Sequence, residues 1–186
     1  MLLLAMPQVL DPFFHRSVVL LIHHEDEGSF GFIVNRPTGI RVSEILQGME
    51  VSWNGPERAV AYFGGPVQPE LGTVLYTPRP ADLASTEGSN VVLPGISLTQ
   101  HAGDLAALAT DPPERFRLFL GYAGWGAGQL VQEILRNDWL TAPVQSELIF
   151  AADPDQVWTA ALDSVGVDPA ALPSWRTPGG SEETTN

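Results

Sequence analysis

The sequence predicts a single α+β domain with a mixed β-sheet. Its 186 residues suffice for one buried core without disulfide or metal support. Strand patterns joined by tight turns occupy the first half, whereas strands that lead into helical patterns occupy the second half. This order favours α+β over a doubly wound parallel sheet. We expect one domain over residues 1–175 and a flexible tail over 176–186, where glycine and charged residues replace apolar ones.

Apolar and β-branched runs around turns indicate the N-terminal elements. LLLAM at residues 2–6 predicts a short strand, and DPFF at 11–14 predicts a turn. The stretch 17–35 predicts a hairpin, because apolar segments flank an acidic loop that contains glycine. A short helix is expected over 42–49, where apolar residues recur at spacings of three and four.

The central segment predicts four further strands and a helix. AVAYFGGPV at 59–67 and GTVLYTP at 72–78 indicate two strands with a Gly-Gly-Pro turn between them. GISL at 95–98 indicates another strand, and DLAALAT at 104–110 belongs to a helix. RFRLFLGYAGW at 115–125 is the clearest strand pattern in the chain.

The C-terminal segment predicts a helix, a strand and a final helix. The stretch 126–140 predicts a helix with Leu130, Ile134 and Leu135 facing inward, and SELIFAA at 146–152 predicts a strand. The last helix is expected to begin at Asp153, because Asp is a favourable N-cap and proline at the next position suits the first helical turn.

The composition excludes several kinds of chemistry. The chain has no cysteine, so it offers no disulfide, thiolate nucleophile or cysteine metal ligand. All nine cationic side chains are arginines, which excludes Schiff-base chemistry and a P-loop lysine. The formal net charge of -13 opposes binding to nucleic acids, whose affinity for proteins comes largely from clustered lysine and arginine. We therefore expect no direct contact with DNA or RNA.

The hydropathy pattern predicts a cytoplasmic protein without a membrane span. No apolar run approaches the roughly 20 residues that a membrane helix needs. The apolar N-terminus lacks a basic region, and Pro7 and Asp11 interrupt it before a cleavage site typical of a signal peptide. We expect neither a membrane contact nor a signal peptide.

The glycine-rich stretch GYAGWGAGQL, residues 121–130, is the most conspicuous motif. Glycines between a strand and a helix can present backbone N–H groups to an anion, so Gly124, Trp125 and Gly126 are candidate ligand-binding residues. The dinucleotide spacing G-x-G-x-x-G is not met, because Gln129 stands where the last glycine belongs. The alternative is that the stretch packs tightly and Trp125 fills core space, and we favour this alternative.

Two arginines suggest an anion-binding cleft. Arg16 and Arg36 border the predicted hairpin, and Asn35 adjoins Arg36. If the strand ends meet the turns at Gly64-Gly65 and Gly124–Gly126, these groups would line a small cleft suited to an anion. The alternative is that Arg36 only pairs with one of the 22 acidic residues.

Metal binding and catalysis receive little support. His23 and His24 precede a run of acidic residues, but neighbouring strand residues point to opposite faces, so a solvated loop is favoured and no metal or cofactor is expected. No serine lies within G-x-S-x-G. A composite acid–base site that uses His15, Arg16 and Ser17, or His101 and Asp104, is conceivable; we nevertheless assign no catalytic residue.

The order of several motifs resembles one protein family. DPFFHRSVVLLIHH, GSFGFIVNRPT, YFGGPVQPELGTVLY and LGYAGWGAGQL, followed by EILRNDWLTAP, look like successive signatures of the bacterial AlgH/YqgE family. The resemblance extends to about Trp158. It implies an α+β fold with a branched, partly barrel-like sheet flanked by helices, and it brings no catalytic residue or cofactor. Some members carry a transcriptional-regulator label through an association with alginate production.

Three functional hypotheses follow from these observations. We favour a regulatory or binding role without catalysis, with a protein partner or a small anionic ligand. One alternative is a transcriptional regulator, as the family label suggests. The other is an anion-binding or hydrolytic enzyme that uses a cleft near Arg16, Arg36 and the glycine-rich turns.

Overall fold

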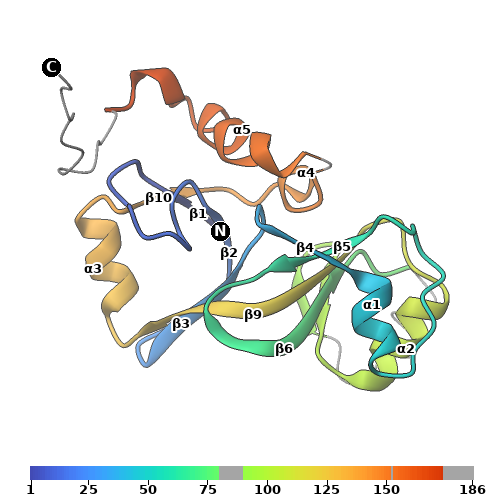
Figure 1. Ribbon diagram of the computed structural model, residues 1–186. Coiled ribbons are helices and arrows are strands. Elements are labelled where there is room, and N and C mark those ends of the chain that lie inside the picture. Colours follow the sequence, from blue (N-terminus) through green and yellow to red (C-terminus); the bar gives the residue numbers. More distant parts are fainter. Residues whose placement is uncertain (80–89, 152, 174–186) are drawn as a thin grey trace, which may run out of the picture.

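The computed structural model describes residues 1–79, 90–151 and 153–173, which contain ten strands and five α-helices (Figure 1). The strands are β1 (Leu2–Ala5), β2 (Val18–Glu25), β3 (Gly28–Ile33), β4 (Pro37–Arg41), β5 (Val60–Phe63), β6 (Val67–Tyr76), β7 (Asn90–Leu93), β8 (Ile96–Thr99), β9 (Phe116–Gly126) and β10 (Trp139–Ala142). The helices are α1 (Val42–Gln47), α2 (Ala102–Thr110), α3 (Gln129–Leu135), α4 (Ser146–Ile149) and α5 (Val157–Asp163), and the 3-10 turns η2 (Pro154–Gln156) and η3 (Pro169–Ala171) flank α5. None of the helices described is long and apolar enough to cross a bilayer. The tail expected at 176–186 lies outside the described residues.

Strand β9 is the branch point of the sheet. The main strand order is β10-β1-β2-β3-β9-β6-β8-β7. One edge of β9 pairs with β6 from Phe116 onwards, while β5 and β3 share the other edge. The β5 pairing, at Phe119 and Leu120, is parallel and the others are antiparallel, so the sheet is mixed. The predicted α+β domain with a branched sheet is confirmed, and the sheet is not closed into a barrel.

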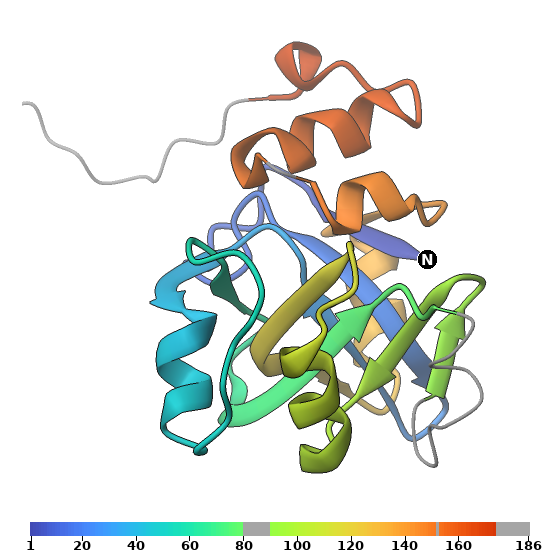
Figure 2. The ribbon, with the colours of Figure 1, turned by 90° about the vertical axis from the view of Figure 1, so that its right-hand side faces the viewer.

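Helices cover both faces of strands β1 to β3. Alternate residues such as Leu4 and Leu20 share a core with α4 and α5, whereas Leu3 and Val19 share a second core with α3. Burial on both faces explains why LLLA and VVLL are continuous apolar runs rather than alternating ones. A third core lies under α1 and α2, and Figure 2 shows these two helices at the opposite end of the molecule from α4 and α5.

Most of the predicted elements are confirmed. Strands β2 and β3 form the expected hairpin, with Glu25 opposite Gly28. The strand pair around the Gly-Gly-Pro turn is present as β5 and β6, although each pairs with β9 and not with the other. The expected cap at Asp153 is also present, because its carboxylate accepts the N–H of Asp155 at 3.1 Å and Pro154 opens the turn.

The strand predicted over SELIFAA is wrong, because residues Ser146–Ile149 form helix α4. Leu148 and Ile149 are adjacent and both buried, which helix packing against the core permits. The carbonyl of Ile149 also accepts a hydrogen bond from Arg117 on β9. This contact joins residues 32 positions apart in the sequence, so local periodicity does not reveal it.

The helix predicted over 126–140 is also shorter than expected. It ends at Leu135, after which Asn137 adopts a left-handed φ of +62°. Trp139 then begins β10, which pairs with β1 and forms an edge of the sheet. Leu135 is 75% exposed, so its predicted inward position is wrong, whereas Leu130 is buried and Ile134 packs against the same core.

The glycine-rich stretch 121–130 is mostly strand. Strand β9 continues through Gly126, and α3 begins only after Gly128, whose φ is +70°. Close packing is found at Gly121, where φ is +67° and an added Cβ would lie 2.4 Å from the Gly65 carbonyl oxygen. At Gly126 an added Cβ would meet nothing closer than the Gln129 side chain at 3.9 Å. The packing interpretation therefore applies to Gly121 and not to Gly126.

Substituting these two glycines should have opposite consequences. We expect Gly121→Ala to lower the free energy of unfolding by more than about 2 kcal/mol, because strain at positive φ adds to a backbone clash. Gly126→Ala should stay within about 1 kcal/mol of the wild type, since the space is open. Urea denaturation of both variants measures the difference, and equal losses would contradict this assignment.

Candidate functional site

A cleft of about 860 Å³ lies between the β1–β2 loop, the end of β3 and the C-terminal segment around α5. His15, Arg16, Asn35, Arg36 and Asp155 are among its lining residues. These residues come from three segments that are far apart in the sequence, and the packing of α5 against β1 and β2 brings them together. The three polar candidates predicted around the hairpin are thus neighbours in one cleft.

Trp158 of α5 forms one wall of this cleft. Its indole N–H donates to the carbonyl of Ala5 at 2.8 Å, which fixes α5 against β1. The guanidinium carbon of Arg16 lies 5.3 Å from the centroid of the Trp158 ring, within the range of a cation–π contact. Arg16 has a φ of +52°, an uncommon conformation for a residue with a side chain. The cleft therefore contains a cation held in a locally unfavourable backbone geometry.

Asn35 connects the cleft to the sheet. Its side chain is 4% exposed, so each polar atom needs a partner within the protein. The Oδ1 atom accepts the N–H of Val18 at 2.9 Å, and the Nδ2 group donates to the carbonyl of Arg16 at 3.0 Å. Asn35 thus positions the backbone of Arg16 instead of offering its own amide to a ligand.

Arg36 is partly buried beside Arg16. Its Nη2 group donates to the carbonyl of His15, and its own carbonyl accepts the N–H of Phe63 at 2.7 Å. Burial lowers the pKa of the Arg36 guanidinium, and the negative charge of Asp155 acts in the opposite direction. No carboxylate in the described ranges forms an ion pair within 4 Å of Arg16 or Arg36. Arg36 therefore does not form the simple salt bridge that was the alternative, at least with a residue that the structure describes.

The predicted residues Gly64 and Gly65 lie elsewhere, buried against β9. An added Cβ on Gly64 would come within 2.2 Å of the Gly121 carbonyl oxygen, and one on Gly65 within 2.2 Å of the Ala123 nitrogen. Neither glycine lines the Arg16–Arg36 cleft. This close approach of two backbones leaves no space for a ligand at that point.

The predicted residues Gly124, Trp125 and Gly126 lie at the end of β9, beside β3. Gly124 and Trp125 border a hollow of about 390 Å³ together with Phe30 and Tyr122. Trp125 is 6% exposed and belongs to the core under α3. The structure therefore separates these three residues from the cleft that contains Arg16 and Arg36.

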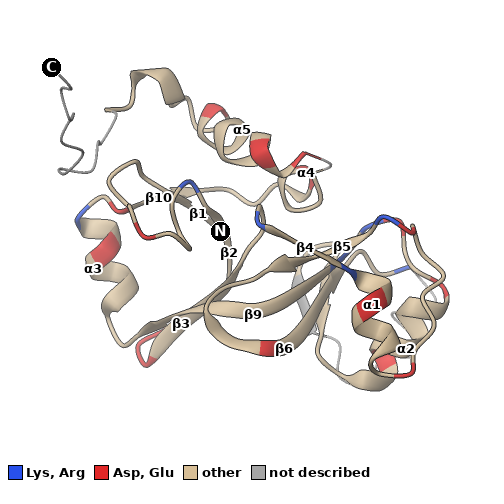
Figure 3. Cartoon of the chain, viewed as in Figure 1, with Lys and Arg blue, Asp and Glu red and all other residues tan. Residues whose placement is uncertain are grey.

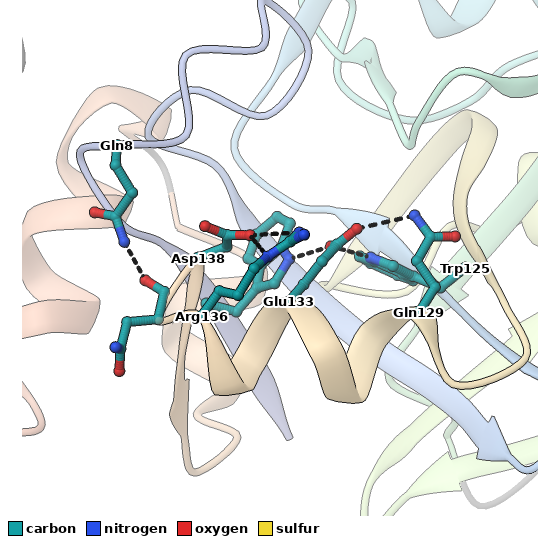
Figure 4. A network of polar contacts seen from close by, with 8 residues as sticks. Gln8, Trp125, Gln129, Glu133, Arg136 and Asp138 are labelled. Carbon is teal, nitrogen blue, oxygen red and sulfur yellow. Dashed lines mark hydrogen bonds and ion pairs between the residues drawn. The ribbon is translucent and has the colours of Figure 1, made fainter.

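Sequence reasoning missed Glu133, which joins the glycine-rich stretch to α3. Its Oε2 atom accepts the indole N–H groups of Trp125 and Trp139, both at 2.8 Å, and its Oε1 atom accepts from Gln129 at 2.9 Å (Figure 4). Gln129 in turn accepts the N–H of Gly126 at 3.0 Å. The spacing of Gln129 and Glu133, four residues apart on a helix, is the one signal that the sequence offers.

Of the conceivable catalytic groups, His15 and Arg16 line the cleft and the others do not. Ser17 is fully buried and its hydroxyl lacks a hydrogen-bond partner, whereas His15 is exposed. His101 and Asp104 lie at the start of α2, and neither lines the cleft. Over the ranges that the structure describes, His, Asp and Glu do not gather into a group of three that could hold a metal ion.

Comparison with known proteins identifies the family. The AlgH-like family model matches residues 2–170. This chain belongs to the AlgH-like family. Among its AlgH-like relatives, a UPF0301 protein of Myxococcus xanthus is 40% identical over 172 residues, which cover 92% of each chain. A UPF0301 protein of Methylococcus capsulatus is 42% identical over 175 residues, which cover 92% of this chain and 91% of the relative.

Solved structures share the AlgH-like fold. The solution structure of the AlgH protein from Pseudomonas aeruginosa superposes with a TM-score of 0.74 at 33% identity, over 90% of this chain and 88% of that one. A crystal structure of a protein from Corynebacterium diphtheriae gives a TM-score of 0.72 at 25% identity, over 87% and 83% of the two chains. The resemblance drawn from the sequence motifs is confirmed.

Removing the Glu133 carboxylate should weaken the fold at α3. We expect Glu133→Ala to lower the free energy of unfolding by about 1–3 kcal/mol, because two largely buried indole N–H groups lose their acceptor. Glu133→Gln retains one acceptor oxygen, so its free energy of unfolding should decrease less than that of Glu133→Ala. Glu44→Ala on the exposed face of α1 is the control. Chemical denaturation followed by tryptophan fluorescence measures the change, and a loss no larger than that of the control would refute the role of Glu133.

Proposed function

We propose that this AlgH-like protein is a cytoplasmic binding protein with a regulatory role, and that it receives a small polar anion in the Arg16–Arg36 cleft. The observation that carries the proposal is the placement of two guanidinium groups in one cleft without an ion-pair partner in the described chain. Guanidinium groups bind carboxylates and phosphates through two parallel hydrogen bonds. The ligand class is therefore a small phosphate or carboxylate.

The two arginines are held in place before a ligand arrives. Arg36 uses one of its five N–H donors on His15, so its other donors remain for an anion. The backbone of Arg16 is fixed by Asn35 and its guanidinium faces Trp158. Groups that are already ordered lose less conformational entropy on binding, which increases affinity.

The negative net charge of the whole protein opposes anion binding in this cleft only weakly. The net charge is -13, and Figure 3 shows Asp and Glu spread over α1, α3 and α5. At physiological ionic strength, charges more than about 8 Å apart are largely screened, so the two nearby guanidinium groups dominate. Asp155 is the acidic residue that lines the cleft itself. It should reduce the affinity for an anion.

Other functions receive less support. A DNA-binding regulator needs a basic surface with several phosphate contacts, and the net charge of -13, with Asp and Glu on several helices in Figure 3, does not favour one. A hydrolytic enzyme with a serine nucleophile needs an accessible hydroxyl, and the hydroxyl of Ser17, next to Arg16, is buried. A binding role without catalysis agrees better with this geometry.

The binding of inorganic phosphate and of succinate tests the proposal. A ligand that binds only the native state raises its stability by RT ln(1 + [L]/Kd), so the melting temperature should increase with ligand concentration at constant ionic strength. Arg36→Gln and Arg16→Gln remove one charge each and should abolish most of this increase. Arg41→Gln, an exposed arginine of β4 outside the cleft, is the matched control and should respond like the wild type.

Asp155→Asn supplies a change in the opposite direction. Removing this negative charge should strengthen anion binding, by about threefold to tenfold for one nearby charge at an effective dielectric constant near that of a protein surface. Isothermal titration calorimetry measures the ratio. The proposal fails if neither anion raises the melting temperature, or if the two cleft arginine variants bind as well as Arg41→Gln.

A further inference from the structure

Arg117 is a buried cation without an acidic partner. Its side chain is 7% exposed, and its guanidinium donates to the carbonyls of Val34 and Ala151, both at 2.9 Å, and to the carbonyl of Ile149. The guanidinium carbon also lies 3.9 Å from the centroid of the Tyr62 ring. No carboxylate of the described residues lies within 4 Å of it. Carbonyl dipoles and one aromatic ring thus compensate a full positive charge.

A hollow of about 400 Å³ adjoins Arg117, between β5 and the segment that joins α4 to α5. Figure 1 shows α4 above β4 and β5. The hollow is separate from the Arg16–Arg36 cleft, although Pro154 lines both. Arg58 also lines it, is exposed, and makes no hydrogen bond or ion pair with the described chain. Two arginines therefore border one hollow.

Apart from the two arginines and Tyr62, the side chains that line the hollow are apolar. Phe116, Phe150 and Val60 contribute to it, and none of its described lining residues is acidic. A second hollow that also includes Arg117 is lined by Arg115 and by two acidic residues, Glu114 and Glu147, so an anion is less favourable there. The first hollow therefore combines two positive charges with an aromatic and aliphatic wall.

The charge of Arg117 gives this combination a physical consequence. Burial lowers the pKa of the Arg117 guanidinium, because a buried charge is poorly solvated. Tyr62 shifts this pKa in the opposite direction. An anion that reaches the hollow would restore part of the lost solvation energy. At least one N–H donor of the guanidinium remains beyond its three carbonyl contacts.

We propose that this hollow is a second binding site, which takes a small carboxylate with an aromatic or aliphatic body. The carboxylate contacts the guanidinium groups of Arg58 and Arg117, and the apolar body packs against Phe116 and Phe150. This chemistry differs from that of the Arg16–Arg36 cleft, where the lining is more polar and Asp155 is present. The inference does not depend on the function proposed above.

Titration with phenylacetate tests this site. Calorimetry gives the dissociation constant, and amide chemical shifts in ¹H–¹⁵N spectra locate the ligand. Arg58→Gln is the informative variant, because Arg58 has no structural contact that its loss would break, whereas substitution of Arg117 would unfold the α4 region. We expect Arg58→Gln to raise the dissociation constant about tenfold, since one charge-assisted contact is lost. Arg41→Gln should leave it unchanged, and the uncharged phenylacetamide should bind more weakly to the wild type.

The site is supported if phenylacetate changes the amide chemical shifts of residues around Val60, Tyr62 and Phe150. These changes should be smaller in Arg58→Gln at the same ligand concentration. The proposal is overturned if phenylacetate does not bind, if Arg58→Gln and Arg41→Gln bind it equally, or if the shifted amides gather around His15 and Arg36. Inorganic phosphate titrated into Arg58→Gln separates the two sites. Phosphate lacks an apolar body, and one of the two arginines of the second hollow is removed in this variant, so its affinity reports mainly on the Arg16–Arg36 cleft. Either site can therefore fail without the other.

Discussion

The guanidinium of Arg117 joins three parts of the chain at one buried point. It belongs to β9, the branch strand, and binds carbonyls at the end of β3 and at the end of α4. A buried charge is strongly unfavourable unless it is hydrogen-bonded. The three carbonyls must therefore stay in contact with the Arg117 guanidinium for the fold to keep it buried. Their positions fix the start of the α4–α5 segment, which supplies Asp155 and Trp158 to the cleft. Both candidate sites therefore depend on this one interaction.

Residues 34–36 carry this constraint from the core to the cleft surface. The Val34 carbonyl binds Arg117, the Asn35 amide binds the backbone of Val18 and Arg16, and Arg36 binds the His15 carbonyl. Three consecutive residues thus connect the branch strand, the first hairpin and the β1–β2 loop. Positions of this kind transmit the rigidity of a sheet to a surface loop, and such a loop can then hold charged side chains in fixed places.

Local patterns in the sequence were sufficient for most of the sheet and for part of the cleft. Alternating and continuous apolar runs located seven of the ten described strands, and the positions of Arg16, Asn35 and Arg36 at strand ends indicated that they could meet. Strands β4, β7 and β10, helix α4 and the role of Glu133 were missed. Strand β10 pairs with β1, and α4 contacts Arg117, so both depend on partners distant in the chain. Glu133 has its partners within eight residues, but the spacing of Gln129 and Glu133 does not reveal which indole groups the carboxylate accepts. Arg117 itself lies within a strand pattern, where nothing local distinguishes a buried arginine from a surface one.

The stretch that identifies the family most readily is distinct from the residues that could bind a ligand. In GYAGWGAGQL, Gly121 allows two backbones to approach, and Trp125 and Gln129 close onto Glu133. These roles use the polar groups of the stretch within the protein and leave little for a solute. Arg16 and Arg36 have the opposite property, because hydrogen bonds hold their backbones and their guanidinium groups retain donors beyond these contacts. A motif that specifies the fold can thus identify a family without indicating its chemistry, and the chemistry must be sought where donors remain unpaired.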